Sequence, residues 1–116
     1  MRFLVLLHGD PDGEASLSAA ERREIVERHI AFTRWLSERG ALVVGEALAP
    51  AGEGRTMRFD DDADPVMTDG PFLETEEALG GFYVLECPSI EEAADILRRV
   101  PRSPGLGIEI RPVAGG

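Results

Sequence analysis

The residues best suited to acid–base chemistry in this chain are His29 and Asp69. His29 shares an apolar stripe with Ile25 and Thr33, each four positions away along an expected helix. An imidazole titrates near neutral pH, which suits a general base. Asp69 precedes Gly70 and a proline, in a turn that could hold its carboxylate in one direction. We therefore expect Asp69 to act as a general acid or base, or to orient the histidine.

Each of these residues also has a purely structural interpretation. A lone histidine on an apolar face is more often a core or interface residue than a catalyst. An aspartate before Gly-Pro can accept backbone N–H groups of its own turn. Phe72, which follows the turn, would either close one wall of a pocket or fill the core. The residues themselves leave both interpretations open.

Three further residues are candidates for binding a small molecule together with Phe72. His8 ends the first expected strand, where site residues are common. Glu46 interrupts an apolar strand, so it either faces solvent or needs a partner inside the protein. Tyr83 alternates with Phe82 and Val84, and its hydroxyl would either donate to a ligand or be satisfied at an interface.

No metal or cofactor site is expected. The two histidines lack H-x-H or H-x-x-x-H spacing, and no glycine-rich phosphate loop occurs. Cys87 follows Glu86, whose carboxylate would raise the thiol pKa and disfavour a nucleophile. The four acidic residues of one short segment lack the glycine and distal glutamate of a calcium loop and are expected to form a solvated hairpin tip: Asp60, Asp61, Asp62 and Asp64.

Composition narrows the functional classes. With 116 residues, 43% of them hydrophobic, the chain is expected to form one domain over residues 1–116. Its net charge of -10 disfavours binding to nucleic acid and to anionic membrane surfaces. The single cysteine and the apolar run of only five residues, 3–7, predict a cytoplasmic protein without a signal peptide.

Hydrophobic periodicity predicts the elements that must position these residues. Strands are expected over 2–8, 41–48, 81–86 and 107–111, and a hairpin over 55–59 and 65–68. Ser18 and Glu21 predict a capping box for a helix that ends before Gly40, and Ser89 with Glu92 predicts a second helix to about residue 99. The first helix should bury a stripe that Phe32 and Trp35 broaden: Ile25, Val26, His29, Ile30, Thr33 and Leu36. The second helix should bury Ala93, Ala94 and Leu97. Residues 9–13 are expected to form a loop.

The element order predicts an α+β, ferredoxin-like antiparallel sheet with two helices on one face. The first strand is apolar on both faces, with Phe3, Val5 and Leu7 on one and Leu4 and Leu6 on the other. Since helices cover one face only, a second copy of the sheet is expected to cover the other. The chain is therefore expected to be a homodimer.

A resemblance to a known family extends over nearly the whole chain. The segment Thr68-Asp69-Gly70-Pro71-Phe72, continued by Leu79-Gly80-Gly81-Phe82-Tyr83, resembles the signature of DGPF proteins, a branch of the YCII-related family. Gly45-Glu46-Ala47-Leu48 and the ending over 108–113 are similar to those of DGPF relatives. The resemblance implies a dimeric α/β barrel.

The resemblance also bears on the active site. His29, eleven positions before Gly40, matches a histidine thought to pair with an aspartate that precedes a proline after the second helix. The matching position here is Val100, before Pro101. Either this chain lacks the dyad, or Asp69 supplies the missing acid.

The resemblance leaves several functions open. Some YCII-related proteins resemble lyases that act on chlorinated hydroxyquinols, so one expectation is a cofactor-free lyase or isomerase acting on a small molecule between sheet and helices. In that enzyme His29 is the base. The alternative is a non-catalytic small-molecule-binding or regulatory protein associated with an extracytoplasmic-function sigma factor. A stable dimer with a vestigial pocket is the third possibility.

Overall fold

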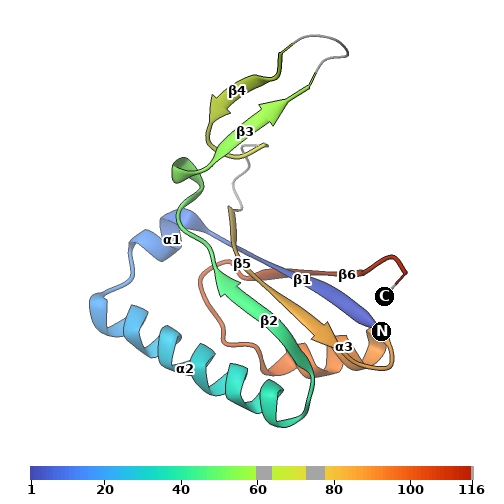
Figure 1. The fold of residues 1–116 in the computed structure, drawn as a ribbon. Coiled ribbons are helices and arrows are strands. Elements are labelled where there is room, and N and C mark those ends of the chain that lie inside the picture. The colour runs from blue at the N-terminus through green and yellow to red at the C-terminus, as the bar shows by residue number, and fades with distance from the viewer. Residues whose placement is uncertain (60–63, 73–77, 116) are drawn as a thin grey trace.

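The computed structural model has an α+β architecture and describes residues 1–59, 64–72 and 78–115. One antiparallel sheet has the strand order β2-β5-β1-β6, and α2 and α3 lie on one of its faces (Figure 1). This arrangement is compatible with the predicted ferredoxin-like fold. The elements are β1 (Arg2–Gly9), α1 (Pro11–Ala15), α2 (Ala19–Glu38), β2 (Leu42–Ala47), η1 (Ala51–Glu53), β3 (Arg55–Arg58), β4 (Val66–Asp69), β5 (Ala78–Glu86), α3 (Ile90–Ile96), η2 (Leu97–Arg99) and β6 (Gly107–Pro112). No helix in this part of the chain is both long and apolar enough to cross a lipid bilayer.

The ends of α2 follow from its sequence. Ser18 and Glu21 exchange side-chain and backbone hydrogen bonds in the predicted capping box. Gly40 follows the helix with a φ of 68°, a conformation that glycine adopts without steric cost. The loop expected over residues 9–13 is wrong in part, because α1 begins at Pro11. Asp10 caps that short helix, and a proline in its first turn is a helix-start signal.

The core forms where α2 and α3 pack on the sheet. Phe3 and Val5 of β1 and Leu85 of β5 are fully buried against Leu36 of α2. The predicted stripe on α2 was too broad: Phe32 and Leu36 are buried as expected, whereas Val26 and Ile30 are exposed. Helix α3 buries Ala93 and Ile96, whereas Ala94, which was predicted to be buried, is exposed.

Trp35 links the end of α2 to η2 through contacts with two arginines. The guanidinium groups of Arg39 and Arg99 lie 4.7 and 4.5 Å from the centre of the Trp35 ring. Phe32 stacks on the same indole at 6.0 Å between ring centroids. Each cation–π contact of this kind contributes roughly 0.5–1 kcal/mol. The helical layer is therefore held together at this corner by aromatic and cationic side chains.

No helix of the described residues lies on the other face of the sheet (Figure 1). We call it the open face. In register, Val44, Val84 and Leu4 form one row across β2, β5 and β1, and Arg111 ends that row on β6. The next row runs from Glu46 through Phe82 and Leu6 to Glu109. The open face thus has an apolar centre and charged side chains at both edges.

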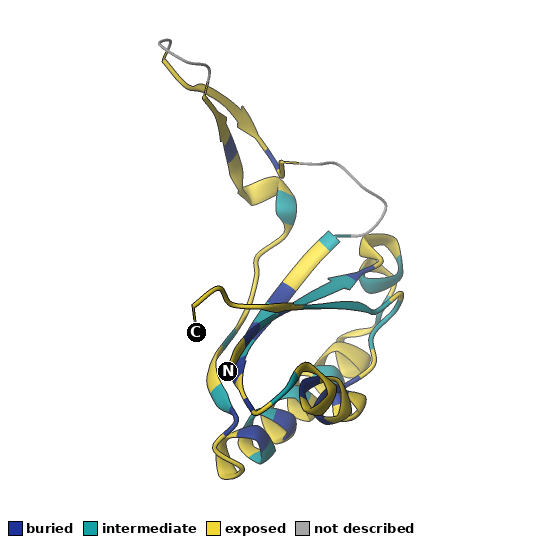
Figure 2. Ribbon diagram, turned by 90° about the vertical axis from the view of Figure 1, so that its right-hand side faces the viewer, coloured by how far each residue is buried: buried dark blue, intermediate teal, exposed yellow. Residues whose placement is uncertain are grey.

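Strands β3 and β4 form a separate hairpin that projects from the domain, as Figure 1 shows. We call residues 54–72 the arm. Apart from Thr56 and Gly70, the described residues of the arm are exposed (Figure 2). It makes the chain extended: the radius of gyration is 16.2 Å, whereas about 13 Å is typical of a globular chain of this length.

Candidate functional site

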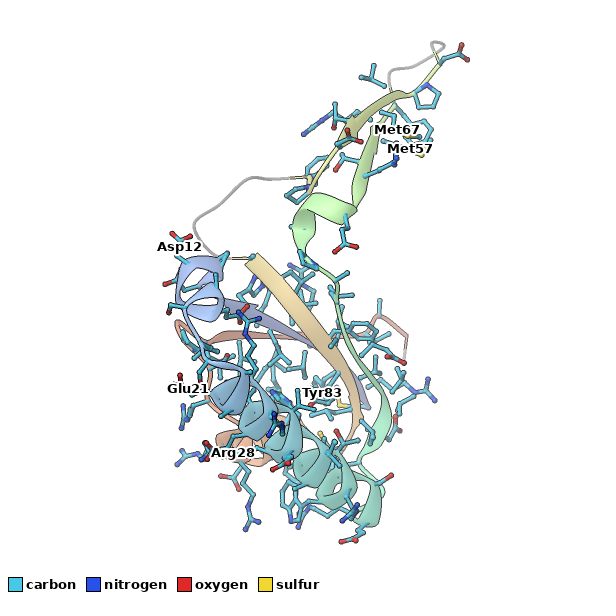
Figure 3. The ribbon with its side chains drawn as sticks, turned by 90° about the vertical axis from the view of Figure 1, so that its left-hand side faces the viewer. Asp12, Glu21, Arg28, Met57, Met67 and Tyr83 are labelled. Atoms are coloured by element: carbon cyan, nitrogen blue, oxygen red, sulfur yellow. The ribbon has the colours of Figure 1, made fainter. Side chains whose placement is uncertain are left out.

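The site centres on a hydrogen bond between α2 and β5. Nδ1 of His29 lies 2.8 Å from the hydroxyl oxygen of Tyr83. His29 is half-buried, and Tyr83 is only 6% exposed. Figure 3 shows Tyr83 between its own strand and α2. The Thr33 side chain, one helical turn after His29, lies close enough to the Tyr83 hydroxyl to lower the pKa of the phenol. A buried phenol, an imidazole and an alcohol therefore form one polar group inside the helix–sheet layer.

The neighbouring residues explain how Tyr83 fits there. Tyr83 pairs with Gly45 of β2, and a Cβ atom at Gly45 would lie 2.7 Å from Cε1 of the tyrosine ring. A side chain at position 45 would therefore displace the ring. Phe32 contacts the ring edge-on, with 5.6 Å between centroids. Glycine on the sheet and phenylalanine on the helix together fix the tyrosine beneath His29.

Burial keeps both members of the pair neutral. It lowers the pKa of His29, because the charged imidazolium loses hydration there. Burial also raises the pKa of Tyr83, and the nearby Thr33 side chain partly offsets that rise. A neutral imidazole has one N–H and one lone pair, so the hydrogen bond at Nδ1 determines which role is left to Nε2. When Nδ1 donates to Tyr83, Nε2 carries the free lone pair of a base.

Asp69 does not take part in this site within one chain. It lies at the end of β4, outside the layer that contains α2 (Figure 1). Its side chain is 84% exposed, and the nearest cation to its carboxylate in the described residues is Arg55, at 3.6 Å. The predicted pairing of His29 with Asp69 is therefore not formed in the single chain.

The turn after Asp69 has a structural role. Gly70 has a φ of 94° and donates its N–H to the Gly54 carbonyl at 2.9 Å. The Thr56 hydroxyl donates to the Gly70 carbonyl at 2.8 Å. These bonds close the base of the arm. No backbone N–H in the described residues donates to the Asp69 carboxylate, so the capping role expected for it is not observed there.

Phe72 lies on the arm, outside the core. Its ring is exposed, and the Arg58 guanidinium lies 4.2 Å from the ring centre. Arg58 also donates to the Phe72 carbonyl at 3.0 Å. The interpretation of Phe72 as a core residue is therefore wrong within one chain, and its role in closing a pocket wall stays a prediction.

His8 and Glu46 lie away from Tyr83. Glu46 pairs with Phe82 on the open face and is exposed. His8 follows Leu4 and Leu6 in strand alternation and lies opposite Leu79 and Gly107, at the far end of the sheet. Glu46 thus lies on the open face, His8 at the far end of the sheet and Phe72 on the arm. Of the four predicted binding residues, only Tyr83 contacts His29.

The position where the family would have an acid is part of the core. Val100 is 4% exposed and belongs to the main apolar cluster. A carboxylate there would have to be buried, at a cost of several kcal/mol without a partner. This position therefore supplies no acid to His29.

Two functional neighbours, Thr33 and Gly45, were not identified from the sequence as parts of the site. Thr33 is four residues after His29, which is a signal for contact on a helix. Gly45 is a glycine inside a strand, which often marks a close approach by another group. The helical spacing of Thr33 and the strand position of Gly45 were both visible in the sequence. Neither feature indicated that the residue lies next to Tyr83.

The described residues contain no cluster of three or more His, Cys, Asp or Glu side chains that could hold a metal ion. Three members of the predicted acidic tip, Asp60, Asp61 and Asp62, lie outside those residues. Burial raises the pKa of Cys87, and Glu92 and Glu86 raise it further. A raised pKa disfavours the thiolate form that a nucleophile requires.

A shallow groove of about 250 Å³ lies beside α2, against residues 102–104. Leu17, Ile25 and Pro104 supply apolar surface, and Glu21, Glu24, Arg28, Arg102 and Ser103 supply polar groups. Ile25 lies one helical turn before His29. Figure 3 shows Glu21 and Arg28 on the same helix. A small polar molecule in this groove would lie beside α2, but neither His29 nor Tyr83 lines it.

Comparison with known proteins assigns the family. Residues 1–114 match the model of the YCII-related domain. An uncharacterized protein from Rhizobium meliloti (strain 1021) is 33% identical over 116 residues, which span 98% of this chain and 93% of that protein. The match covers β1, α2 and β5, and therefore both His29 and Tyr83. The chain belongs to the YCII-related domain family.

Proposed function

We propose that this protein is a small, cofactor-free acid–base enzyme of lyase or isomerase type, with His29 as the base and Tyr83 as its partner. The observation that carries the proposal is the 2.8 Å hydrogen bond between a half-buried histidine and a buried tyrosine. In this proposal Tyr83, and not Asp69, orients the imidazole of His29, because the Asp69 carboxylate lies on the arm.

The proposed chemistry is removal of a proton from a small molecule by Nε2 of His29. This step requires the tautomer in which Nδ1–H donates to the Tyr83 hydroxyl oxygen, a bond that holds the imidazole in one orientation. The lowered pKa of His29 keeps the base unprotonated at neutral pH. Aromatic hydroxy compounds, including chlorinated hydroxyquinols, are the first substrates to test, because of the family resemblance and because the Phe32 ring packs against Tyr83.

The test compares matched variants on a panel of such compounds, with binding and turnover measured separately. His29→Gln should lower kcat/KM about 10²–10⁴-fold, the usual contribution of a general base. Tyr83→Phe should lower kcat less and shift the acidic limb of the pH profile, because Tyr83 acts through the imidazole. Ile30→Ala, on the exposed side of the same helix, is the control and should leave both constants unchanged. Equal turnover by wild type and His29→Gln would disprove the assignment.

A second candidate is a non-catalytic small-molecule-binding protein with a regulatory role. It is favoured by Val100, which leaves His29 without the carboxylate expected from the family pattern. Wild type that binds a compound of the panel without turning it over, and a His29→Gln variant that loses this affinity, would support it. Association with an extracytoplasmic-function sigma factor stays a prediction.

We also propose that the protein is a homodimer, in which two open faces pack together as a dimeric α/β barrel. An apolar centre with charged edges is the usual composition of an interface. Leu4, Leu6 and Val84 lack a covering layer within one chain, and sheets commonly pack face to face. A twofold arrangement uses the same surface of both copies.

A further inference from the structure

We propose that the arm packs one of its faces against a second copy of this chain. The proposal rests on the homodimer described above and adds a contact surface outside the sheet. The face consists of Met57 and Met67, with Arg55 and Asp69 at its base. We call it the methionine face.

Strand register places these residues together. Met57 lies directly opposite Met67, and Arg55 lies directly opposite Asp69. Positions two apart on a strand point to the same side, so all four side chains share one face of the hairpin. Figure 3 shows Met57 and Met67 side by side near the outer end of the arm. Their exposures of 46% and 52% leave about half of each side chain without a partner in the single chain.

The arm depends on contacts that its own chain does not supply. Among the described residues, every hydrogen bond and ion pair of residues 55–72 has its other partner within residues 54–72. A two-stranded hairpin with no layer against it is marginally stable in water. Of the 14 large hydrophobic residues that are exposed in the described part of the chain, the arm nevertheless carries five: Met57, Phe59, Val66, Met67 and Phe72. Apolar side chains gathered on an exposed surface in this way are typical of a protein–protein contact.

The opposite face of the arm is already partly covered. Arg58 lies over the ring of Phe72, and Thr56 hydrogen-bonds Gly70. The methionine face has no such internal cover. Methionine side chains are flexible and adapt to irregular partner surfaces. The methionine face is therefore the side on which a partner would bind.

Charge and connectivity favour a second copy as that partner. Each chain has a net charge of -10, so two copies repel each other over most of their surfaces. The methionine face is an exception, because the formal charges of Arg55 and Asp69 cancel. The arm also follows β2, an edge strand of the open face. A second copy on the open face would lie next to the start of the arm, and twofold symmetry would give both arms the same contact.

Hydrogen exchange of the wild-type protein at several concentrations tests the contact without any substitution. Amides within β3 and β4 should exchange more slowly at concentrations where the dimer forms than at concentrations where it dissociates. The Phe82→Asp variant, altered on the open face, serves as the dissociated reference. Equal exchange of these amides at every concentration, in a protein shown to dimerise, overturns the arm contact and leaves the sheet dimer intact. A protein that is monomeric at every concentration overturns both.

Sedimentation equilibrium of variants gives the second measurement. The Met57→Ser, Met67→Ser double variant should raise the dimer dissociation constant at least about tenfold, which corresponds to about 1.4 kcal/mol. Val66→Ser, on the other face of the same arm, is the matched control and should change that constant less than about twofold. A double variant with the dissociation constant of wild type overturns the proposal. Neither readout depends on turnover, so failure of the His29 mechanism is distinguishable from failure of the arm contact.

Discussion

At the residue scale, burial of His29 makes folding depend on pH. The pKa of His29 is lowered from its ordinary value of 6.5 in the folded protein, so the unfolded chain binds more protons around that pH. The stability that comes from keeping His29 neutral is fully present above about pH 6.5 and is lost as the pH falls through the folded pKa. We therefore expect the free energy of unfolding to decrease between about pH 7.5 and about pH 5.5.

Urea denaturation at several pH values measures this effect. His29→Gln should show a smaller decrease over the same range than wild type, whereas His8→Gln should keep it. Glu21 does not interfere, because hydrogen bonds with Ser18 lower its pKa below 4.5, outside the range. Parallel stability curves for wild type and His29→Gln would show that His29 is not the group responsible.

At the element scale, the turn at Gly70 joins the two strands of the arm at its base through hydrogen bonds to Gly54 and Thr56. Gly70 has a φ of 94°, where any residue with a Cβ atom is strained. Gly70→Ala should therefore destabilise the arm by about 1–2 kcal/mol, the cost of a left-handed backbone for other residues. Because the arm's bonds are internal, amides of β3 and β4 should exchange about 5–30 times faster, while those of β1 and β5 keep their rates. Gly107→Ala, where a methyl group meets nothing within 4 Å, is the control.

The outcome for Gly70→Ala separates two roles of the turn. Faster exchange limited to the arm agrees with a local closure. Faster exchange throughout the sheet would mean that the turn supports the whole domain, against the hydrogen bonds described above.

The elements themselves were largely predictable from the sequence. Apolar alternation located β1 and β6, and Ser18 with Gly40 located both ends of α2. Periodicity could not decide which side of a broad apolar stripe faces inward, so Val26 and Ile30 were assigned to the core wrongly. That choice depends on where the sheet lies, which local pattern does not contain.

The candidate site was less predictable, because its contacts join distant parts of the chain. His29 and Tyr83 were both named as candidates, but their sequence separation of 54 carries no local signal of contact. Asp69 was linked to His29 by chemistry alone. Its position on a projecting hairpin follows from tertiary structure, since no turn motif specifies the distance to another element.

At the scale of the whole molecule, net charge opposes self-association. Two copies carry -10 each, and their repulsion extends over about 30 Å at 10 mM salt but only about 8 Å at 150 mM. An apolar dimer should therefore tighten several-fold as salt rises over this range. Sedimentation equilibrium at both salt concentrations measures the change. Weakening by salt would instead indicate an interface held by ion pairs.

The corner around Trp35 gives the protein an intrinsic optical probe. Trp35 is the only tryptophan, and it contacts Arg39 of its own helix and Arg99 of η2. Its fluorescence should therefore report separation of η2 from α2, without a label or an added dye. Tyr83 is the only tyrosine, so its absorption in the ultraviolet would report the ionisation of the phenol next to His29. The two chromophores allow the helical layer and the candidate site to be followed separately in one solution.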